Sequence, residues 1–152
     1  MAYYHLSSDN DKCGVHIHMN RNFFTNSDVF AIDYFINNCR DFWKKIARRE
    51  SHYSAYINKS HDEWGYQTSD RHCALNLSND HTIELRIFKG TDDIKILNAY
   101  LDITNSLAHF IHKMQKKTSI YQIENQKLIE MFHDYLMKNS LDSTKKYLKQ
   151  VA

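Results

Sequence analysis

The sequence of 152 residues contains no proline and only three glycines and three cysteines. Average usage would supply roughly eight prolines and ten glycines in a chain of this length. Because glycine adopts backbone conformations that other residues avoid, Gly14, Gly65 and Gly90 are expected to mark places where the backbone needs that freedom. The odd number of cysteines, with no CxxC spacing, argues against a disulfide scaffold and favours a reducing compartment.

Long apolar runs and an excess of one charge are also missing. No run approaches the ~20 apolar residues that span a bilayer, and the N-terminus lacks the basic and apolar regions of a secretory signal. The formal charge is only +2, so charge alone does not predict nucleic-acid binding. With 42% apolar and 25% charged residues, we expect a globular, cytoplasmic protein whose residues 1–152 form a single domain.

Hydrophobic periodicity predicts the first two elements. Apolar and polar residues alternate over residues 13–20, as in a half-buried strand. Capping residues at 25–27 then precede a long helix over 28–50. Its apolar stripe has helical spacing and consists of Val29, Ile32, Ile36, Cys39, Trp43 and Ile46. Residues 51–69 show no periodicity and are expected to form a loop.

The second half of the sequence predicts a hairpin followed by helices. Strands over 71–77 and 82–88 are expected to pair antiparallel, because Asn79 and Asp80 tolerate the tight turn between them. Three amphipathic helices are expected to follow, over 93–117, 122–138 and 141–150. The predicted fold class is therefore α+β, with an antiparallel sheet of three or more strands packed against long amphipathic helices.

The polar faces of two predicted strands carry side chains suited to a metal bound to a phosphate. His16 and His18 project from one face of their strand, ~6.5–7 Å apart, and Glu84 and Arg86 share a face of theirs. If the strands are neighbours, these four side chains form one patch. Glu and His can ligate a divalent cation, and Arg binds phosphate oxygens bidentately. Either pair could equally be an ordinary solvated strand face.

These blocks resemble a known enzyme family. The sequence CGVHIHMN, the following Arg48-Arg49-Glu50 and the later RHCALNLSNDHTIELRIFKGT are similar, in the same order, to the amidoligases. Amidoligases belong to the glutamine synthetase and γ-glutamylcysteine ligase superfamily of carboxylate–amine ligases. The resemblance covers residues 12–114 and implies half of a glutamine-synthetase-like domain. It also implies ATP and Mg²⁺ as cofactors, which activate a carboxylate as an acyl phosphate for attack by an amine.

The resemblance implies a role for each matching residue. His16 and Glu84 match metal ligands, and His18 matches a contact to the nucleotide phosphate. Arg86 matches a contact to phosphate or to the substrate carboxylate. Arg71, at the start of the preceding strand, matches a position that is often basic and could hold phosphate.

The chain departs from the family in its N-terminal part. Amidoligases have an N-terminal half with a Glu-x-Glu pair that holds further metal ions, whereas residues 1–12 contain no Glu. Since Mg²⁺ demands near-octahedral oxygen coordination, we expect no free-standing ligase, although a second chain could complete one. The sheet edge that the missing half would cover is expected to invite pairing with another chain, including self-association.

A protein that keeps this core without the ligase machinery is expected to act by binding. The Asn-, Lys-, Ile- and Tyr-rich composition resembles coding by an AT-rich genome, such as that of a phage or mobile element. An anti-CRISPR-type inhibitor of a host nuclease is one concrete form. Residues 44–72 mix basic and aromatic side chains, which favour protein interfaces and could also touch nucleic acid. The predicted partner-binding residues are Arg48, Arg49, Tyr53, Tyr56, Trp64 and Tyr66. The alternative is that this loop packs its aromatic rings on its own domain.

Two other readings of the HxH pair remain open. Cys13 could begin a zinc site with the two histidines, completed by His72 and Cys73, although this spacing matches no common zinc module. HxH on a strand is also the metal motif of HUH endonucleases, which nick single-stranded DNA with a tyrosine. That class places HxH inside a sheet with strands before it, and only fifteen residues precede His16.

Overall fold

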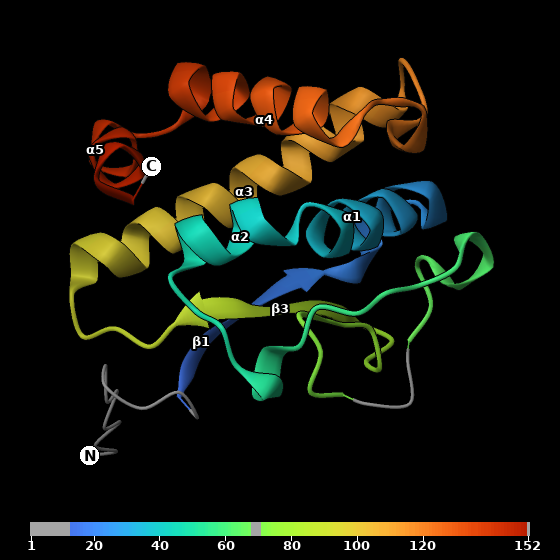
Figure 1. The fold of residues 1–152 in the computed structure, drawn as a ribbon, viewed down its shortest axis with the longest axis horizontal. Helices are drawn as coiled ribbons and strands as arrows, with labels where there is room; N and C mark the ends of the chain where they lie inside the picture. The colour runs from blue at the N-terminus through green and yellow to red at the C-terminus, as the bar shows by residue number, and fades with distance from the viewer. Residues whose placement is uncertain (1–12, 68–70, 152) are drawn as a thin grey trace.

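The computed structural model describes residues 13–67 and 71–151, and the described chain has the predicted α+β fold (Figure 1). Its α-helices all lie on one side of a three-stranded sheet, and the loop that begins at residue 48 passes along an edge of the sheet, where Ala55 pairs with Cys73, and reaches the first helix. The strands are β1 (Gly14–Asn20), β2 (Leu75–Asn76) and β3 (Thr82–Lys89). The α-helices are α1 (Asn26–Asn38), α2 (Arg40–Ala47), α3 (Ile94–Gln115), α4 (Asn125–Asn139) and α5 (Asp142–Val151). Short 3-10 helices are η1 (Arg21–Phe23), η2 (His52–Ser54), η3 (His61–Glu63) and η4 (Ile120–Gln122).

The sheet has the order β1-β3-β2, with both pairs antiparallel. The predicted hairpin is therefore confirmed, and the HxH strand is the second neighbour of β3. Strand β2 is shorter than the predicted 71–77. The chain before it pairs with the preceding loop instead: Cys73 forms an isolated parallel bridge with Ala55, and the Ala74 amide donates to the Ala55 carbonyl at 2.8 Å.

A β-bulge in β3 changes which residues face the helices. Opposite His16, β3 has two residues, Arg86 and Ile87, because the register between the two strands shifts there. As a result Phe88 is buried next to Ile87 and stacks on Tyr100 of α3, with ring centroids 4.4 Å apart. The sequence predicts that buried and outward-facing side chains alternate along this strand. That prediction is wrong beyond Arg86, because Ile87 and Phe88 are both buried.

The predicted long helix over 28–50 is two helices. Cys39 ends α1 and precedes α2 with φ −100° and ψ 35°, outside the helical region. The break turns α2 so that the buried Trp43 indole donates to the Phe35 carbonyl at 3.2 Å. The whole predicted stripe is nevertheless buried. The predicted cap is confirmed, because Thr25 and Asp28 form a capping box at the start of α1.

The C-terminal helices close the side of the core away from the sheet. Phe132 of α4 is fully buried among the rings of Phe35, Trp43 and Phe110. Tyr147 of α5 donates its hydroxyl to the Ile46 carbonyl of α2. In the described part of the chain, none of the helices combines the length and the apolar character that crossing a membrane requires.

A buried ion pair fastens the loop between α2 and β2 to α1. The ammonium of Lys59 donates to the Asp33 carboxylate, and both side chains are almost fully buried. Asp33 also accepts from the amide of Gly65 at 2.8 Å and from Asn37 at 2.8 Å. Gly65 has φ +81°, and a Cβ there would lie 3.2 Å from the Phe30 Cα, so this loop touches α1 closely only with glycine.

We expect Lys59→Met to destabilise the protein by about 3–5 kcal/mol, because it leaves the Asp33 carboxylate buried without a counter-charge. Urea unfolding at pH 7 measures this loss. The matched control is Lys146→Met at an exposed position of α5, which should change stability by less than about 0.5 kcal/mol. Equal stability of the two variants would show that the ion pair does not hold the loop.

Candidate functional site

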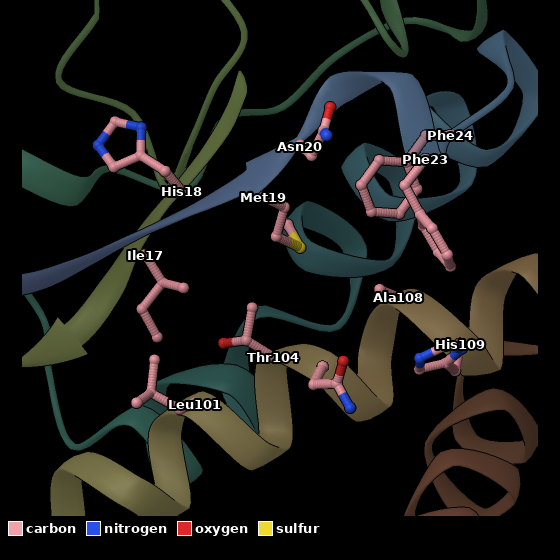
Figure 2. Close-up of a pocket in the computed structure, with 11 residues that line it drawn as sticks. Ile17, His18, Met19, Asn20, Phe23, Phe24, Leu101, Thr104, Ala108 and His109 are labelled. Carbon is pink, nitrogen blue, oxygen red and sulfur yellow. The ribbon is translucent and has the colours of Figure 1, made fainter. Parts of the chain in front are cut away.

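The four residues predicted as a patch lie together on the sheet face opposite the helices. His18 of β1 pairs directly with Glu84 of β3. Figure 2 shows Ile17 and Met19 pointing toward α3 and His18 pointing away from it. Because side chains alternate along a strand, His16 shares the face of His18. This polar face is the side of the sheet away from the helices.

Glu84 is the centre of the cluster, and both of its carboxylate oxygens are engaged. Oε1 lies 2.9 Å from the Arg86 guanidinium and 3.0 Å from Nδ1 of His16. Nε2 of His18 is more distant from the same oxygen, at 3.9 Å. Oε2 accepts a hydrogen bond from the Asn76 amide at 2.7 Å. Side chains of all three strands therefore meet at one buried carboxylate.

The surroundings shift the pKa of two of these groups. Burial acts to raise the pKa of Glu84. The hydrogen bond from Asn76 and the positive charges around the carboxylate outweigh burial, and the pKa lies below its ordinary 4.5. Burial and then the charge of Arg86 lower the pKa of His16 below 6.5, although Glu84 acts to raise it. Near pH 7 the neutral form of His16 therefore predominates, with its Nδ1 3.0 Å from Glu84.

A second arginine, Arg49 in the loop after α2, packs against the start of β1 next to the cluster. The Arg49 guanidinium donates to the Arg86 carbonyl at 2.8 Å. It fills the space beside Gly14, because a Cβ on Gly14 would lie 1.9 Å from its Nη1. Arg49 and Arg86 bring two guanidinium groups to this face beside the Glu84 carboxylate. The Nε of Arg86 is buried without a hydrogen-bond partner.

This arrangement does not fit the Mg²⁺ and ATP that the family resemblance implies. A magnesium site needs carboxylate oxygens free for the ion, but Arg86 and Asn76 occupy those of Glu84. Within residues 13–67 and 71–151, no group of three or more His, Cys, Asp or Glu side chains is arranged to hold a metal. The zinc alternative gains no support either, since the Cys73 thiol donates to the Leu75 carbonyl at 2.9 Å.

The remaining predicted residues lie apart from Glu84 or are buried. Arg71 is exposed before β2 and makes no hydrogen bond or ion pair with any described residue. Trp64 is buried, with its ring 5.6 Å from Tyr34, and the expectation that it is exposed is therefore wrong. Burial also raises the pKa of Tyr56, whose hydroxyl is buried. Arg49 is buried in the cluster, and Tyr53 is half-buried. Arg48 and Tyr66 are exposed.

Two members of the site were missed from the sequence. Asn76 was assigned only to a strand, yet it is the hydrogen-bond donor that completes Glu84. Thr82 shares the outer part of the site, because its hydroxyl lies 3.2 Å from Nδ1 of His18. The signal for Asn76 was the antiparallel register, which places Asn76 and His18 on either side of Glu84.

A groove follows the outer edge of β1, next to this polar face (Figure 2). It has a volume of about 370 Å³ and lies between β1, η1 and α3. Within the described residues β1 pairs only with β3, so its other edge has no strand beside it. Phe23 is 43% exposed and Leu101 46% exposed at this groove. Its apolar lining includes Ile17, Met19, Phe23, Phe24, Leu101 and Ala108.

No family model, curated protein or solved structure matches this chain. The relationship to the amidoligases therefore remains a prediction from the sequence blocks.

We expect Glu84→Gln to lower the free energy of unfolding at pH 7 by about 1–3 kcal/mol, because the charge between Arg86 and the imidazoles is lost. The depressed pKa values of Glu84 and His16 both stabilise the fold above the ordinary values of these groups, 4.5 and 6.5. That stability is lost as the pH falls through their folded values.

The wild-type protein should therefore lose stability on acidification below pH 6.5, and the variant should lose less of it below 4.5. Urea unfolding in a pH series measures both effects. Glu130→Gln, at an exposed carboxylate of α4, is the control and should follow the wild-type curve. If the free energy of unfolding depended on pH in the same way for wild type and Glu84→Gln, the Glu84 carboxylate would not be the group that stabilises the cluster.

Proposed function

We propose that this protein is a non-catalytic binding protein that takes an extended segment of a partner protein along the outer edge of β1. The observation that carries the proposal is the combination of an edge that no strand of the described residues covers and an apolar groove beside it. Strand addition supplies main-chain hydrogen bonds for affinity, and pockets for alternate side chains supply specificity.

The two faces of β1 define the partner segment. On the helical face an added strand would lie over the groove, where Leu101 and Phe23 expose apolar surface. On the other face it would lie beside His16 and His18, next to the Arg86 guanidinium. The complementary segment therefore alternates apolar and acidic residues.

A second copy of this chain fits the edge less well. Antiparallel pairing of two β1 strands about a two-fold axis would bring His16 or His18 opposite an imidazole of the other copy. Imidazoles opposite each other supply no complementary charge. We therefore propose a different, acidic partner rather than the self-association that the sequence suggested.

The class of partner follows the expectation from the sequence. We propose a host protein as the target, with inhibition of a host enzyme, such as a CRISPR nuclease, as the biological role. The small size and AT-rich coding pattern of the chain support a phage or mobile-element source. The contact surface moves, however, from residues 44–72 to β1, because Trp64 and Arg49 are buried.

The ligase alternative is less well supported by the site. A second chain could supply missing carboxylates, but Glu84 would still have to release Arg86 and Asn76 to bind a metal ion. The structure does not support the HUH alternative either, because that class has its HxH strand in the middle of a sheet and β1 lies at an edge of the described sheet.

The probe for this proposal is a pair of eight-residue peptides, one alternating Val and Glu and the other alternating Val and Lys. NMR titration of the labelled protein should show amide shifts along β1 with the Glu peptide and at least tenfold weaker binding of the Lys peptide. Leu101→Glu should weaken binding of the Glu peptide by at least tenfold, because it places a charge in the groove.

The matched control is Leu141→Glu, at a residue that is 61% exposed between α4 and α5 and should leave peptide binding unchanged. Binding that ignores Leu101→Glu would overturn the proposed surface. Sedimentation that finds a stable dimer, dissociated by the same substitution, would show instead that a second copy occupies the edge. The same variant pair then tests any partner that co-purifies from a bacterial host.

A further inference from the structure

A second cavity, of about 430 Å³, lies at the start of α1 and shares no lining residue with the groove at β1. Four separated segments build it: η1, the first turns of α1, the loop after η3, and η4. Its size is within the range of small-ligand sites. Aromatic rings dominate the lining, namely those of Phe30, His61, Trp64, Tyr66 and Tyr121.

Three of these rings form a fixed aromatic wall. The centroids of Phe30, His61 and Tyr121 lie 5.5–5.7 Å from one another, in tilted and edge-to-face arrangements. Such contacts are favourable for aromatic pairs, and they join α1, η3 and η4. The wall is therefore part of the folded structure rather than a set of loose surface rings.

Tyr66 stands at this cavity as an exposed ring on a restrained backbone. Its side chain is 70% exposed and has no ring contact with any described residue. The main chain is nevertheless held, because the Tyr66 carbonyl accepts from Lys59 at 2.9 Å and its amide donates to Glu63 at 3.2 Å. Gly65 beside it is bound to Asp33. A large ring presented in this way is suited to stacking on a flat ligand.

The polar part of the cavity favours an anion. Arg21 lines it, and its guanidinium makes no ion pair or hydrogen bond with a described residue. The Arg21 amide donates to the His81 carbonyl at 2.9 Å, which fixes the position of the backbone. None of the described lining residues is Asp or Glu. The nearest acids in the loop have local partners. The Asp62 carboxylate lies 3.5 Å from Nδ1 of His61, and the Glu63 carboxylate accepts a hydrogen bond from the Ser60 amide.

We propose that this cavity binds a nucleotide, with the base stacked on Tyr66 and the aromatic wall and the phosphate at Arg21. Base stacking needs no particular base, because every base has a π-face, and guanidinium is the preferred donor group for phosphate. The nucleotide could be free or belong to a single-stranded nucleic acid, and both supply the same chemistry. This inference does not rest on the proposed peptide-binding role of β1.

The first test uses AMP, adenosine and ribose 5-phosphate as probes of the labelled protein by NMR. AMP should shift the resonances of Tyr66, Phe30 and Tyr121, and either half of the molecule alone should bind more weakly. Tyr66→Ala should weaken AMP binding about tenfold, the order that loss of one base–aromatic stack produces, whereas Tyr66→Phe should retain it.

The second test separates the phosphate contact from the stacking. Arg21→Ala should weaken AMP binding about tenfold and leave adenosine binding unchanged. The matched control is Arg71→Ala, at an exposed arginine that is not among the lining residues. All variants lie at surface positions, and thermal unfolding confirms that each is folded.

The third test identifies the source of the nucleotide. Binding of an octa-adenylate RNA much tighter than that of AMP, with affinity that falls steeply as salt is added, assigns the site to single-stranded nucleic acid. Equal affinity for both probes assigns it to a free nucleotide. The proposal is overturned if neither probe shifts the Tyr66 resonances, or if Tyr66→Ala and Arg71→Ala bind AMP equally well.

Discussion

Strand β3 is the element on which the rest of the sheet depends, because it is paired along both edges and covered by helices on one face. Ile83 and Leu85 are fully buried toward the helices, and Glu84 and Arg86 alternate with them toward the other face. A carboxylate this close to a core is tolerated only when it is hydrogen-bonded. Glu84 meets that requirement with hydrogen bonds from Asn76 of β2 and from Arg86 of its own strand.

The features that the sequence predicts well are those set by local periodicity. The helix α3 appears within two residues of the expected 93–117 at both ends, because one apolar stripe repeats over many turns. The HxH and Glu-x-Arg faces met as expected, since period-two alternation and an antiparallel hairpin bring them together. The local sequence pattern does not predict the bulge at Arg86 and Ile87, because a bulge is a feature of the pairing between two strands.

The less predictable features depend on contacts between distant residues. The break at Cys39 leaves the apolar stripe intact, so periodicity alone reads α1 and α2 as one helix. Trp64 looks like an exposed loop aromatic, but the ion pair of Lys59 with Asp33 draws that loop onto α1. These two charges are 26 residues apart in the chain, and nothing local links them. Tyr66, next to the turn at Gly65, remains exposed.

Within the described residues, the outer edge of β1 has little of the protection that edge strands usually carry. Natural sheets block their edges with lysine, proline, bulges or inward charges, whereas β1 has the sequence GVHIHMN, without lysine or proline, and the bulged residues belong to β3. Its polar side chains are those of His16, His18 and Asn20, and burial together with the charge of Arg86 lowers the pKa of His16. A strand without Asp, Glu, Lys or Arg next to an apolar groove gains most when another strand covers it. In the proposed complex an acidic segment complements the imidazoles and the nearby Arg86 guanidinium, whereas a second copy of β1 supplies only imidazoles again.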